Sequence, residues 1–455
     1  MKNSCYKSKE IIKPGNSNYN RARQVWNRAI QKYPLAIAYC KNIGDVKECI
    51  LWCRKNDIQF RIRSKGHSFE GYSVEDNLLT IDLSKMKYIK LDSTKNTITI
   101  QSGVTLGEIY NFLSPKGYPF PGGTCPSVGA TVFSLGGGFG FSTRYLSLGC
   151  DSIEEIKLID YKGRLITANR NSNSDLFWAC KGSGGGHFGI VVCTTYKLFN
   201  KVNKVTLISL NYPTGSKNQQ LAFFDTWQKW LLTADNRITF NIGIENSLKD
   251  GISIFGGGLF YGTPEEAKII IKPLYDLAKE NMKFEHLNLL DAHSKITSLY
   301  PKCRSFKFTG RFVYEPFAVD ELRNILGFIT SDPPKGSTYT SVSFSGLGGK
   351  VMDFDKNTSS FAYRCAKFIL GIQSVWNDNK CKPGDASIKE ANVNWIKDKF
   401  NYLYDLTNGC YVNFADNEIS NYEKEFFDGN LSKLKKIKRK YDPLNVFKFP
   451  QSIKP

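Results

Sequence analysis

In the first seventy residues, the hydrophobic and polar positions follow the period of a strand in some segments and the period of a helix in another. Residues 35–40 (LAIAYC) form a short apolar run and residues 58–63 (IQFRIR) alternate, which predicts two strands. Between them, residues 45–56 (DVKECILWCRKN) carry apolar side chains at helical spacing. This strand–helix–strand unit leads directly into a glycine turn, RSKGHSFEG, at 63–71.

The same reading continues to about residue 200. Apolar runs predict strands, and longer amphipathic segments predict helices. Two further glycine-rich segments interrupt the pattern, at 119–140 (PFPGGTCPSVGATVFSLGGGFG) and 182–189. The predicted strands are 78–83, 97–103, 153–160, 165–168 and 190–199, and the predicted helices are 106–117 and 175–182.

After residue 205 the pattern changes to alternating strands interleaved with long helices. We expect strands at 205–212, 252–262 and 337–346, helices at 218–232 and 264–280, and then a strand at 411–414 and a closing helix within 420–447. This pattern predicts an α+β protein with an antiparallel sheet flanked by helices. The length of 455 residues is enough for two domains. We place one at 1–205, completed by 406–455, and the other at 206–405.

The composition adds a formal net charge of +20, from 62 Lys and Arg against 42 Asp and Glu. Such a charge attracts anions, including nucleic acids and phosphorylated cofactors. The lysines are spread along the chain, and we interpret the one dense run, KLKKIKRK at 433–440, as the solvated face of a terminal helix. A basic nucleic-acid-binding protein is an alternative that this charge alone suggests, but it does not explain the glycine-rich segments.

Twelve cysteines would suit a secreted disulfide scaffold, but the N-terminal residues have no apolar core of a signal peptide. No run is long and apolar enough to span a bilayer. We therefore expect a cytoplasmic protein with most thiols free and buried, and neither a membrane nor nucleic acid as partner. Cys49 and Cys53 share a predicted helix, but no second pair accompanies them. With four histidines in the chain, we expect no metal site.

Each glycine-rich segment lies near the end of a predicted strand. Glycine admits positive φ and lets bare backbone N–H groups approach an anion closely. Three such segments, with Arg61 and Arg63 before the first, suggest a long ligand that carries phosphates. The spacing of a Rossmann site is missing from GGGFGFSTR and from GSGGGHFG, and no Walker loop is present. The sequence therefore predicts a dinucleotide bound on a different fold.

Several blocks of the chain resemble the berberine-bridge-enzyme-like branch of the vanillyl-alcohol-oxidase flavoproteins. RIRSKGHSFEG (61–71) is similar to that family's pyrophosphate loop, and GGTCPSVGATVFSLGGGFG (122–140) has the family's cysteine-to-glycine spacing. DLFWACKGSGGGHFGI (175–190), YVNF (411–414) and DPLNVF (442–447) also match family motifs. The resemblance implies a two-domain PCMH-type FAD-binding fold and an FAD-dependent oxidoreductase acting on a small organic substrate.

The resemblance also implies how the cofactor is held. In this family a histidine and a cysteine commonly bond covalently to the flavin, and His67 and Cys125 occupy those positions. The further positions that match cofactor contacts of the family are Arg63, Ser64, Lys65, Gly66, Ser68, Gly129, Gly136, Gly137, Gly138, Leu148, Asp151, Gly189, Ile190 and Asn413. Leu148 matches a position that borders the reactive flavin carbon, where a bulky residue is typical of dehydrogenase-like members. The acceptor is oxygen or another oxidant.

The same resemblance places Tyr411, Asn413 and Gln373 at the catalytic centre. Oxidation of an alcohol needs a base for the hydroxyl proton, and the second tyrosine of the family's Y-x-N-Y motif is Phe414 here. This departure favours an amine or a pre-activated substrate over a simple alcohol. Lys65, Ser152 and His187 also depart from the family pattern, and a positive φ at Lys65 would be strained. The alternative is a flavin-binding protein of the same fold that has lost turnover. No feature of the sequence predicts an oligomeric state.

Overall fold

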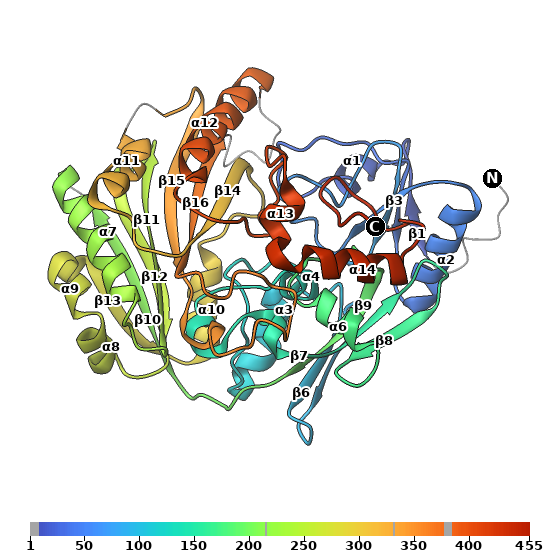
Figure 1. The fold of residues 1–455 in the computed structure, drawn as a ribbon, viewed down its shortest axis with the longest axis horizontal. Coiled ribbons are helices and arrows are strands. Elements are labelled where there is room, and N and C mark those ends of the chain that lie inside the picture. The colour runs from blue at the N-terminus through green and yellow to red at the C-terminus, as the bar shows by residue number, and fades with distance from the viewer. Residues whose placement is uncertain (1–8, 214–215, 331–332, 377–384) are drawn as a thin grey trace.

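The computed structural model describes residues 9–213, 216–330, 333–376 and 385–455. Two groups of layers lie side by side (Figure 1): a large sheet with helices on its outer face, and a more compact arrangement of two smaller sheets with helices around them. None of the described helices combines the length and the apolar character needed to cross a bilayer. The predicted α+β architecture, with an antiparallel sheet flanked by helices, is confirmed.

Two small sheets form the first group. One is mixed, with the order β1 (Glu10–Ile12), β2 (Ala36–Tyr39), β4 (Leu79–Asp82) and β3 (Phe60–Arg63), and β4 pairs in parallel with both β2 and β3. The other is antiparallel, with the order β5 (Ile89–Asp92), β6 (Thr97–Gln101), β9 (Ile190–Lys197), β7 (Ile153–Ile159) and β8 (Leu165–Asn169).

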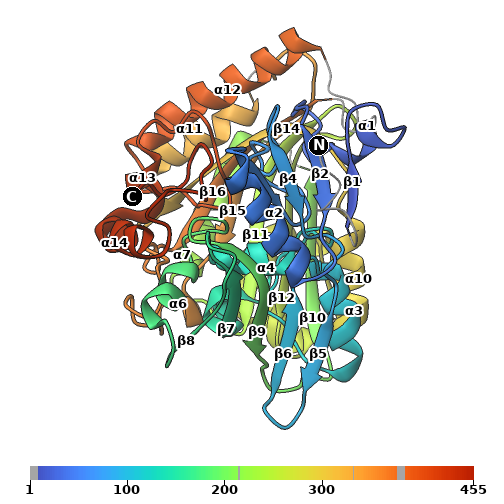
Figure 2. The same ribbon diagram turned by 90° about the vertical axis from the view of Figure 1, so that its right-hand side faces the viewer.

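The predicted strand–helix–strand opening is present as β2, α2 and β3. Helix α2 (Ile43–Lys55) begins where the side chain of Asn42 accepts a hydrogen bond from the backbone of Asp45, and it buries the apolar face that the spacing predicts. The other helices of this half are α1 (Tyr19–Ala22), α3 (Leu106–Leu113), α4 (Ala130–Leu135), α5 (Thr143–Leu146) and α6 (Ser174–Cys180). Figure 2 shows α2 beside the mixed sheet.

The second group is a seven-stranded antiparallel sheet. Its order is β13 (Met282–Leu287), β10 (Val205–Pro213), β12 (Gly251–Phe260), β11 (Ile238–Ser247), β15 (Ser337–Gly346), β16 (Phe368–Trp376) and β14 (Ser305–Val313). One face carries the core, where α7 (Lys217–Leu231), α11 (Val319–Thr330) and α12 (Ala386–Tyr404) pack against the strands. The opposite face is therefore available to form a wall of the functional site.

The remaining helices are α8 (Pro264–Ile270), α9 (Lys272–Ala278), α10 (Leu289–Ser298), α13 (Tyr422–Phe427) and α14 (Leu431–Tyr441). The single helix predicted for 264–280 is wrong: the chain bends between α8 and α9, because Pro273 cannot donate a backbone hydrogen bond there. The closing helix is likewise two helices, α13 and α14, joined by a short 3₁₀ helix (Asp428–Asn430).

The predicted strand at 411–414 is also wrong. Cys410 forms an isolated bridge with Arg311, and the chain then turns, with the amide of Phe414 donating to the carbonyl of Tyr411 at 2.8 Å. The turn is stabilised by side-chain bonds to distant residues, which local periodicity does not reveal. Segment 347–366 also packs into the hydrophobic core of the first group, through Leu347, Val351 and Phe361.

The described cysteines follow the prediction that most thiols are free and buried. Nine are free, and of these Cys125 and Cys193 are half-buried and Cys365 is exposed. Cys303 is disulfide-bonded. No cluster of three or more metal-ligating side chains occurs within the described parts of the chain.

Candidate active site

A cavity of about 710 Å³ lies between the glycine-rich segments and the large sheet. Its wall includes residues 64–69, 123–125, 184–187 and 411–415, together with side chains from the large sheet. The three glycine-rich segments therefore meet at one place, as their shared chemistry suggests. The volume lies within the range of about 300–1,000 Å³ that is usual for ligand pockets.

His67 and Cys125 lie together in this wall. Nε2 of His67 is 2.9 Å from Oγ of Ser127, and Sγ of Cys125 is 3.6 Å from the same oxygen. The imidazole also stacks on the indole of Trp26, with ring centroids 5.3 Å apart and planes 27° apart. One ring nitrogen and one sulfur are thus held at the same side of the cavity.

The electrostatic surroundings keep the imidazole of His67 neutral. Burial, and to a smaller extent the nearby ammonium group of Lys65, lower the pKa of His67 to about 4. A neutral imidazole retains a lone pair on one nitrogen and is therefore a nucleophile at neutral pH.

The charged side chains of the described wall are basic. Arg61, Lys65, Arg304 and Lys448 contribute to it, and no Asp or Glu does within the described residues. Burial lowers the pKa of both Arg61 and Lys65, because the charged form loses hydration. An anion bound beside them would restore this lost stabilisation.

The backbone of the first glycine-rich segment offers donors to such an anion. The N–H groups of residues 65–68 make no hydrogen bond to any other described group. Gly66 has φ +70°, a conformation that side chains disfavour. A Cβ at Gly129 would lie 2.3 Å from Oγ of Ser64, so glycine is required where these two segments meet.

Four buried polar atoms of wall residues lack a hydrogen-bond partner among the described residues. They are Nε1 of Trp26, Nε of Arg61, Oγ of Ser73 and Oε1 of Gln451. Buried polar groups are normally paired. A ligand with many acceptors and donors, such as a dinucleotide, therefore fits this wall.

The turn at 411–414 holds the second glycine-rich segment in place. The hydroxyl of Tyr411 accepts hydrogen bonds from the N–H of Gly138 and from Nδ2 of Asn413, both at 2.9 Å. Nδ2 of Asn413 also donates to the carbonyl of Phe133 at 3.0 Å. A Cβ at Gly136 would lie 2.1 Å from Oδ1 of Asn413. This glycine is therefore needed for the turn to approach.

The large sheet supplies a polar floor with an aromatic border. Gln373 on β16 pairs with Ser341 on β15, and the remaining polar wall residues of the sheet include Ser209, Asn241, Ser343 and Ser345. At the border, Phe414 stacks on Phe69 at 5.4 Å and meets Phe308 edge-on at 4.7 Å.

Comparison with known proteins agrees with this geometry. A family model described as "FAD binding domain" matches residues 34–169, and one described as "Berberine and berberine like" matches residues 410–454. The FAD-linked oxidoreductase YgaK of Bacillus subtilis (strain 168) is 32% identical over 456 residues, covering 98% of this chain and 96% of that protein. The chain belongs to the berberine-bridge-enzyme-like FAD-linked oxidoreductases.

Other members of the family agree in sequence and in fold. The xylooligosaccharide oxidase of Thermothelomyces thermophilus is 26% identical, covering 94% of this chain and 89% of that protein. The solved structure of berberine bridge enzyme from Eschscholzia californica superimposes with a TM-score of 0.88 at 22% identity, covering 99% of this chain and 97% of that one. The PCMH-type flavoprotein fold is thereby confirmed.

Not all residues that the family resemblance suggested as cofactor contacts line the cavity. Ser64, Lys65, Gly66, Ser68, Gly129, Gly189, Ile190 and Asn413 do, with His67 and Cys125. The residues that do not line it are Arg63, Gly136, Gly137, Gly138, Leu148 and Asp151. Arg63 forms an ion pair with Asp82 that joins β3 to β4. The three glycines shape the segment beneath Tyr411 and Asn413.

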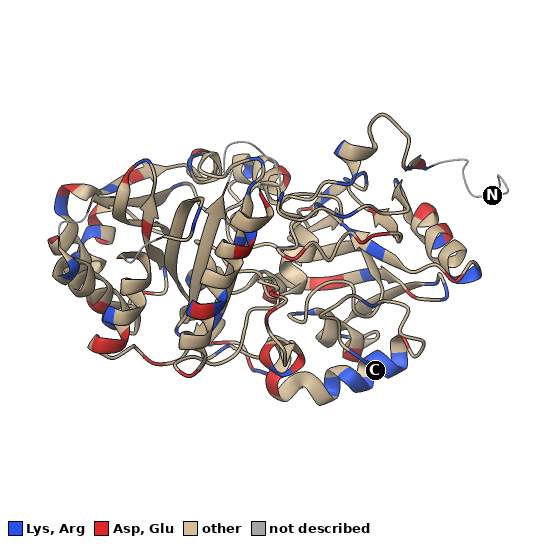
Figure 3. Ribbon diagram, turned by 90° about the horizontal axis from the view of Figure 1, so that it is seen from above, with Lys and Arg blue, Asp and Glu red and all other residues tan. Residues whose placement is uncertain are grey.

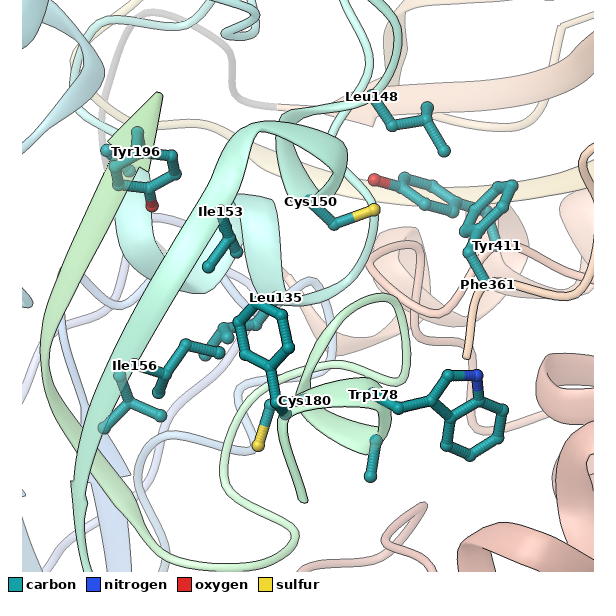
Figure 4. Packing of buried hydrophobic residues seen from close by; sticks show 14 of the residues in the cluster. Leu135, Leu148, Cys150, Ile153, Ile156, Trp178, Cys180, Tyr196, Phe361 and Tyr411 are labelled. Atoms are coloured by element: carbon teal, nitrogen blue, oxygen red, sulfur yellow. The ribbon is translucent and has the colours of Figure 1, made fainter. Parts of the chain in front are cut away.

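In this berberine-bridge-enzyme-like chain, Asp151 is bonded to other protein side chains and Leu148 is packed in the hydrophobic core. Both carboxylate oxygens of Asp151 accept hydrogen bonds from Arg364, at 2.6 and 3.1 Å, and one also accepts from Ser147 at 2.6 Å. Leu148 is buried in the core near Tyr411 and Cys150 (Figure 4). The side chain of Leu148 is turned into the protein and does not line the cavity.

Two departures from the family pattern are accommodated without strain. Lys65 has an ordinary φ, and the positive φ falls on Gly66 instead. His187 is buried, and its Nδ1 accepts a hydrogen bond from the amide of Ile453 at 3.1 Å. Burial and the neighbouring Lys438 lower the pKa of His187 to about 3. The sequence motifs did not identify Trp26 or Ser127. Trp26 lies far along the chain from the segment that carries His67, and Ser127 lies beside Cys125 but has no distinguishing pattern.

Proposed function

We propose that this FAD-linked oxidoreductase holds its flavin through two covalent bonds, from His67 and from Cys125. The observation that supports the proposal is the contact of both side chains with the hydroxyl of Ser127, which places them at one wall of one cavity. When bound, FAD would accept a hydride from a small organic substrate and pass the electrons to oxygen or another acceptor.

The remaining cofactor contacts that we propose are the wall residues already described. The unpaired N–H groups of residues 65–68, with Arg61 and Lys65, suit the negative charge of a pyrophosphate. We further propose that residues 1–205 with 406–455 form the cofactor domain and that residues 206–405 form the substrate domain. In support, the large sheet has its own hydrophobic core on the face away from the cavity.

The wall favours a substrate that loses a hydride without a strong base from the protein. Phe414 has no hydroxyl, and the hydroxyl of Tyr411 already accepts two hydrogen bonds from the protein. No carboxylate lines the described part of the cavity, and the amide of Gln373 cannot take a proton. We propose an amine, oxidised as the neutral base, or a pre-activated substrate. Gln373 would orient it, and Tyr411 and Asn413 would position the glycine-rich segment.

A carbohydrate is the second candidate, and a specific observation favours it. Hydroxyl and amide side chains on the large sheet (Ser209, Asn241, Ser341, Ser343 and Gln373) would suit a polyhydroxylated ligand. The relative named as a xylooligosaccharide oxidase also favours a carbohydrate as substrate.

The test is anaerobic mixing of the purified protein with panels of amines and of sugars, followed by the absorbance of the bound flavin. Bleaching by amines, with little or none by sugars, is the expected result. Faster bleaching by sugars would replace the amine proposal with the carbohydrate one. If no donor in either panel bleached the flavin, the proposed oxidoreductase activity would be contradicted. The alternative, a flavin-binding protein without catalysis, would then be favoured.

A further inference from the structure

Ser127 occupies a position that none of the family's matching motifs assigns to the cofactor. It lies outside the cavity wall and is exposed, yet its hydroxyl reaches both side chains proposed for flavin attachment. The two distances are 2.9 Å to Nε2 of His67 and 3.6 Å to Sγ of Cys125. A hydroxyl is both a donor and an acceptor, so it can serve both contacts together.

The bond to Ser127 distinguishes the two nitrogens of His67. Nε2 is engaged by the hydroxyl, whereas Nδ1 makes no hydrogen bond to any group in the described parts of the chain. Stacking on Trp26 restrains the plane of the ring, and the bond at Nε2 restrains its rotation within that plane. Together the two contacts leave Nδ1 as the nitrogen available to a ligand.

The same hydroxyl restrains Cys125. Two further hydrogen bonds hold the segment that carries this cysteine: Tyr110 donates to the carbonyl of Gly123 at 2.6 Å, and Tyr300 contacts the hydroxyl of Thr124. These contacts place the backbone, and among the described residues the hydroxyl of Ser127 is the hydrogen-bonding partner of the sulfur. The rotamer of Cys125 is therefore coupled to the orientation of His67.

We propose that Ser127 is a positioning residue for both covalent attachments, holding His67 so that Nδ1 forms the bond and holding Cys125 towards the same cofactor. The inference rests on the proposed bicovalent flavin. At His67 the N–H bond and one C–H bond of the flavin methyl group break, and the N–C bond forms. At Cys125 the S–H bond and one ring C–H bond break, and the S–C bond forms. Each attachment releases two protons and two electrons, and the electrons leave through the acceptor that also serves turnover.

The solvent exposure of Ser127 fits this role. Protons released at His67 and Cys125 need a route out of a cavity whose described wall has no carboxylate to receive them. A hydroxyl that contacts both groups and also faces water provides that route. A hydroxyl also fits both states of His67, since Nε2 keeps a lone pair after Nδ1 has been substituted.

The experiment separates the two attachments by using two parent variants. In Cys125→Ala only the histidyl bond can form, and in His67→Ala only the cysteinyl bond can form. Apoprotein of each parent, alone and with Ser127→Ala or Ser127→Thr, is mixed with FAD. Total bound flavin is measured after gel filtration, and covalent flavin is measured in the acid precipitate over time. Ser134→Ala is the control, because its hydroxyl donates to the carbonyl of Ala130 in its own helix and makes no hydrogen bond to His67 or Cys125.

The expected result is a slowing of covalent attachment by about tenfold or more in Ser127→Ala in both parents, with total bound FAD unchanged. Ser127→Thr should restore the rate, and Ser134→Ala should leave it unaffected. Flavopeptides from Cys125→Ala should carry the flavin bond at Nδ1 of His67. When Ser127→Ala is added to that parent, flavopeptides bonded at Nε2 should appear as well. A rate unchanged in either parent, or a bond at Nε2 in the parent itself, would overturn the role of Ser127.

The failure of the proposed function would be distinguishable from this outcome. If neither parent retained any flavin after acid precipitation, the bicovalent proposal itself would be overturned, whatever the Ser127 variants did. Measuring the bond position in the parent also keeps the inference testable if Ser127→Ala fails to fold.

Discussion

Lys438 donates a hydrogen bond from Nζ to the backbone carbonyl of His187 at 2.7 Å. The contact joins helix α14 to the third glycine-rich segment, whose residues line the cavity. Nζ also bonds to Asp442 and to the carbonyl of Phe447, each at 2.7 Å, and the side chains of Lys438 and Asp442 are both fully buried. Figure 3 marks in blue the basic positions along this helix, and most of these residues are exposed. Lys438 is the exception to the expectation of a solvated face at 433–440.

Replacing Lys438 with Met should lower the free energy of unfolding by about 3–5 kcal/mol, since the carboxylate of Asp442 would stay buried without its partner. Urea unfolding followed by fluorescence measures this change. Lys436→Met is the matched control on the exposed face of the same helix, and its effect should stay within about 0.5 kcal/mol. Equal effects of the two substitutions would contradict the structural role of Lys438.

The sequence predicted those elements whose cause is local. The strand–helix–strand opening follows from its apolar spacing, and α2 ends within a residue of the expected position. The break before Pro273 and the turn at 411–414 were missed. The apolar pattern continues through Pro273, so periodicity alone does not reveal the break. The turn depends on contacts of Tyr411 and Asn413 with residues about 275 positions away. Burial of Lys438 likewise depends on carbonyls that no local pattern reveals.

For the site, the motifs predicted that His67 and Cys125 serve one ligand, and both residues line the same cavity. They could not show that Leu148 turns into the core, because side-chain direction after a glycine-rich turn depends on packing. The role of Ser127 could not be predicted, because a serine two residues after a cysteine has no distinguishing pattern. Its contact with His67 joins residues that are far apart in the sequence.

Stability should fall as the pH is lowered from about 6.5 towards 4. Burial lowers the pKa of His293 to about 4, and its ring stacks on Tyr110 at 3.9 Å. In this range the unfolded chain binds a proton at His293 that the folded chain does not, so acidification favours unfolding. Urea unfolding between pH 4.5 and 7.5 should show a shallower loss for His293→Phe, which keeps the stack, than for the native protein. Parallel curves would contradict this.

Phe414→Tyr should raise the rate of flavin reduction by an alcohol or a sugar. The substitution adds a hydroxyl at the base position of the family motif, and its ring keeps the stack with Phe69. General base catalysis contributes roughly 10²–10⁴-fold, so an increase of about 10²-fold or more is expected. Stopped-flow reduction with matched amine and alcohol donors measures it. An equal change with both donors would argue against a missing base.

Leu148→Ala should destabilise the protein without changing how fast the reduced flavin reacts with oxygen. The side chain is buried in the core, and truncating a buried leucine costs about 2–5 kcal/mol. Unfolding in urea measures the first effect, and reoxidation by oxygen in a stopped-flow instrument measures the second. Faster reoxidation with unchanged stability would restore the gating role that the family resemblance suggested.

The most direct test of the bicovalent account is acid precipitation of the purified protein, followed by absorbance and mass of the pellet. We expect the native protein, His67→Ala and Cys125→Ala each to keep flavin in the pellet, and the double variant to lose it. Free FAD in the supernatant of the native protein would contradict the covalent attachment.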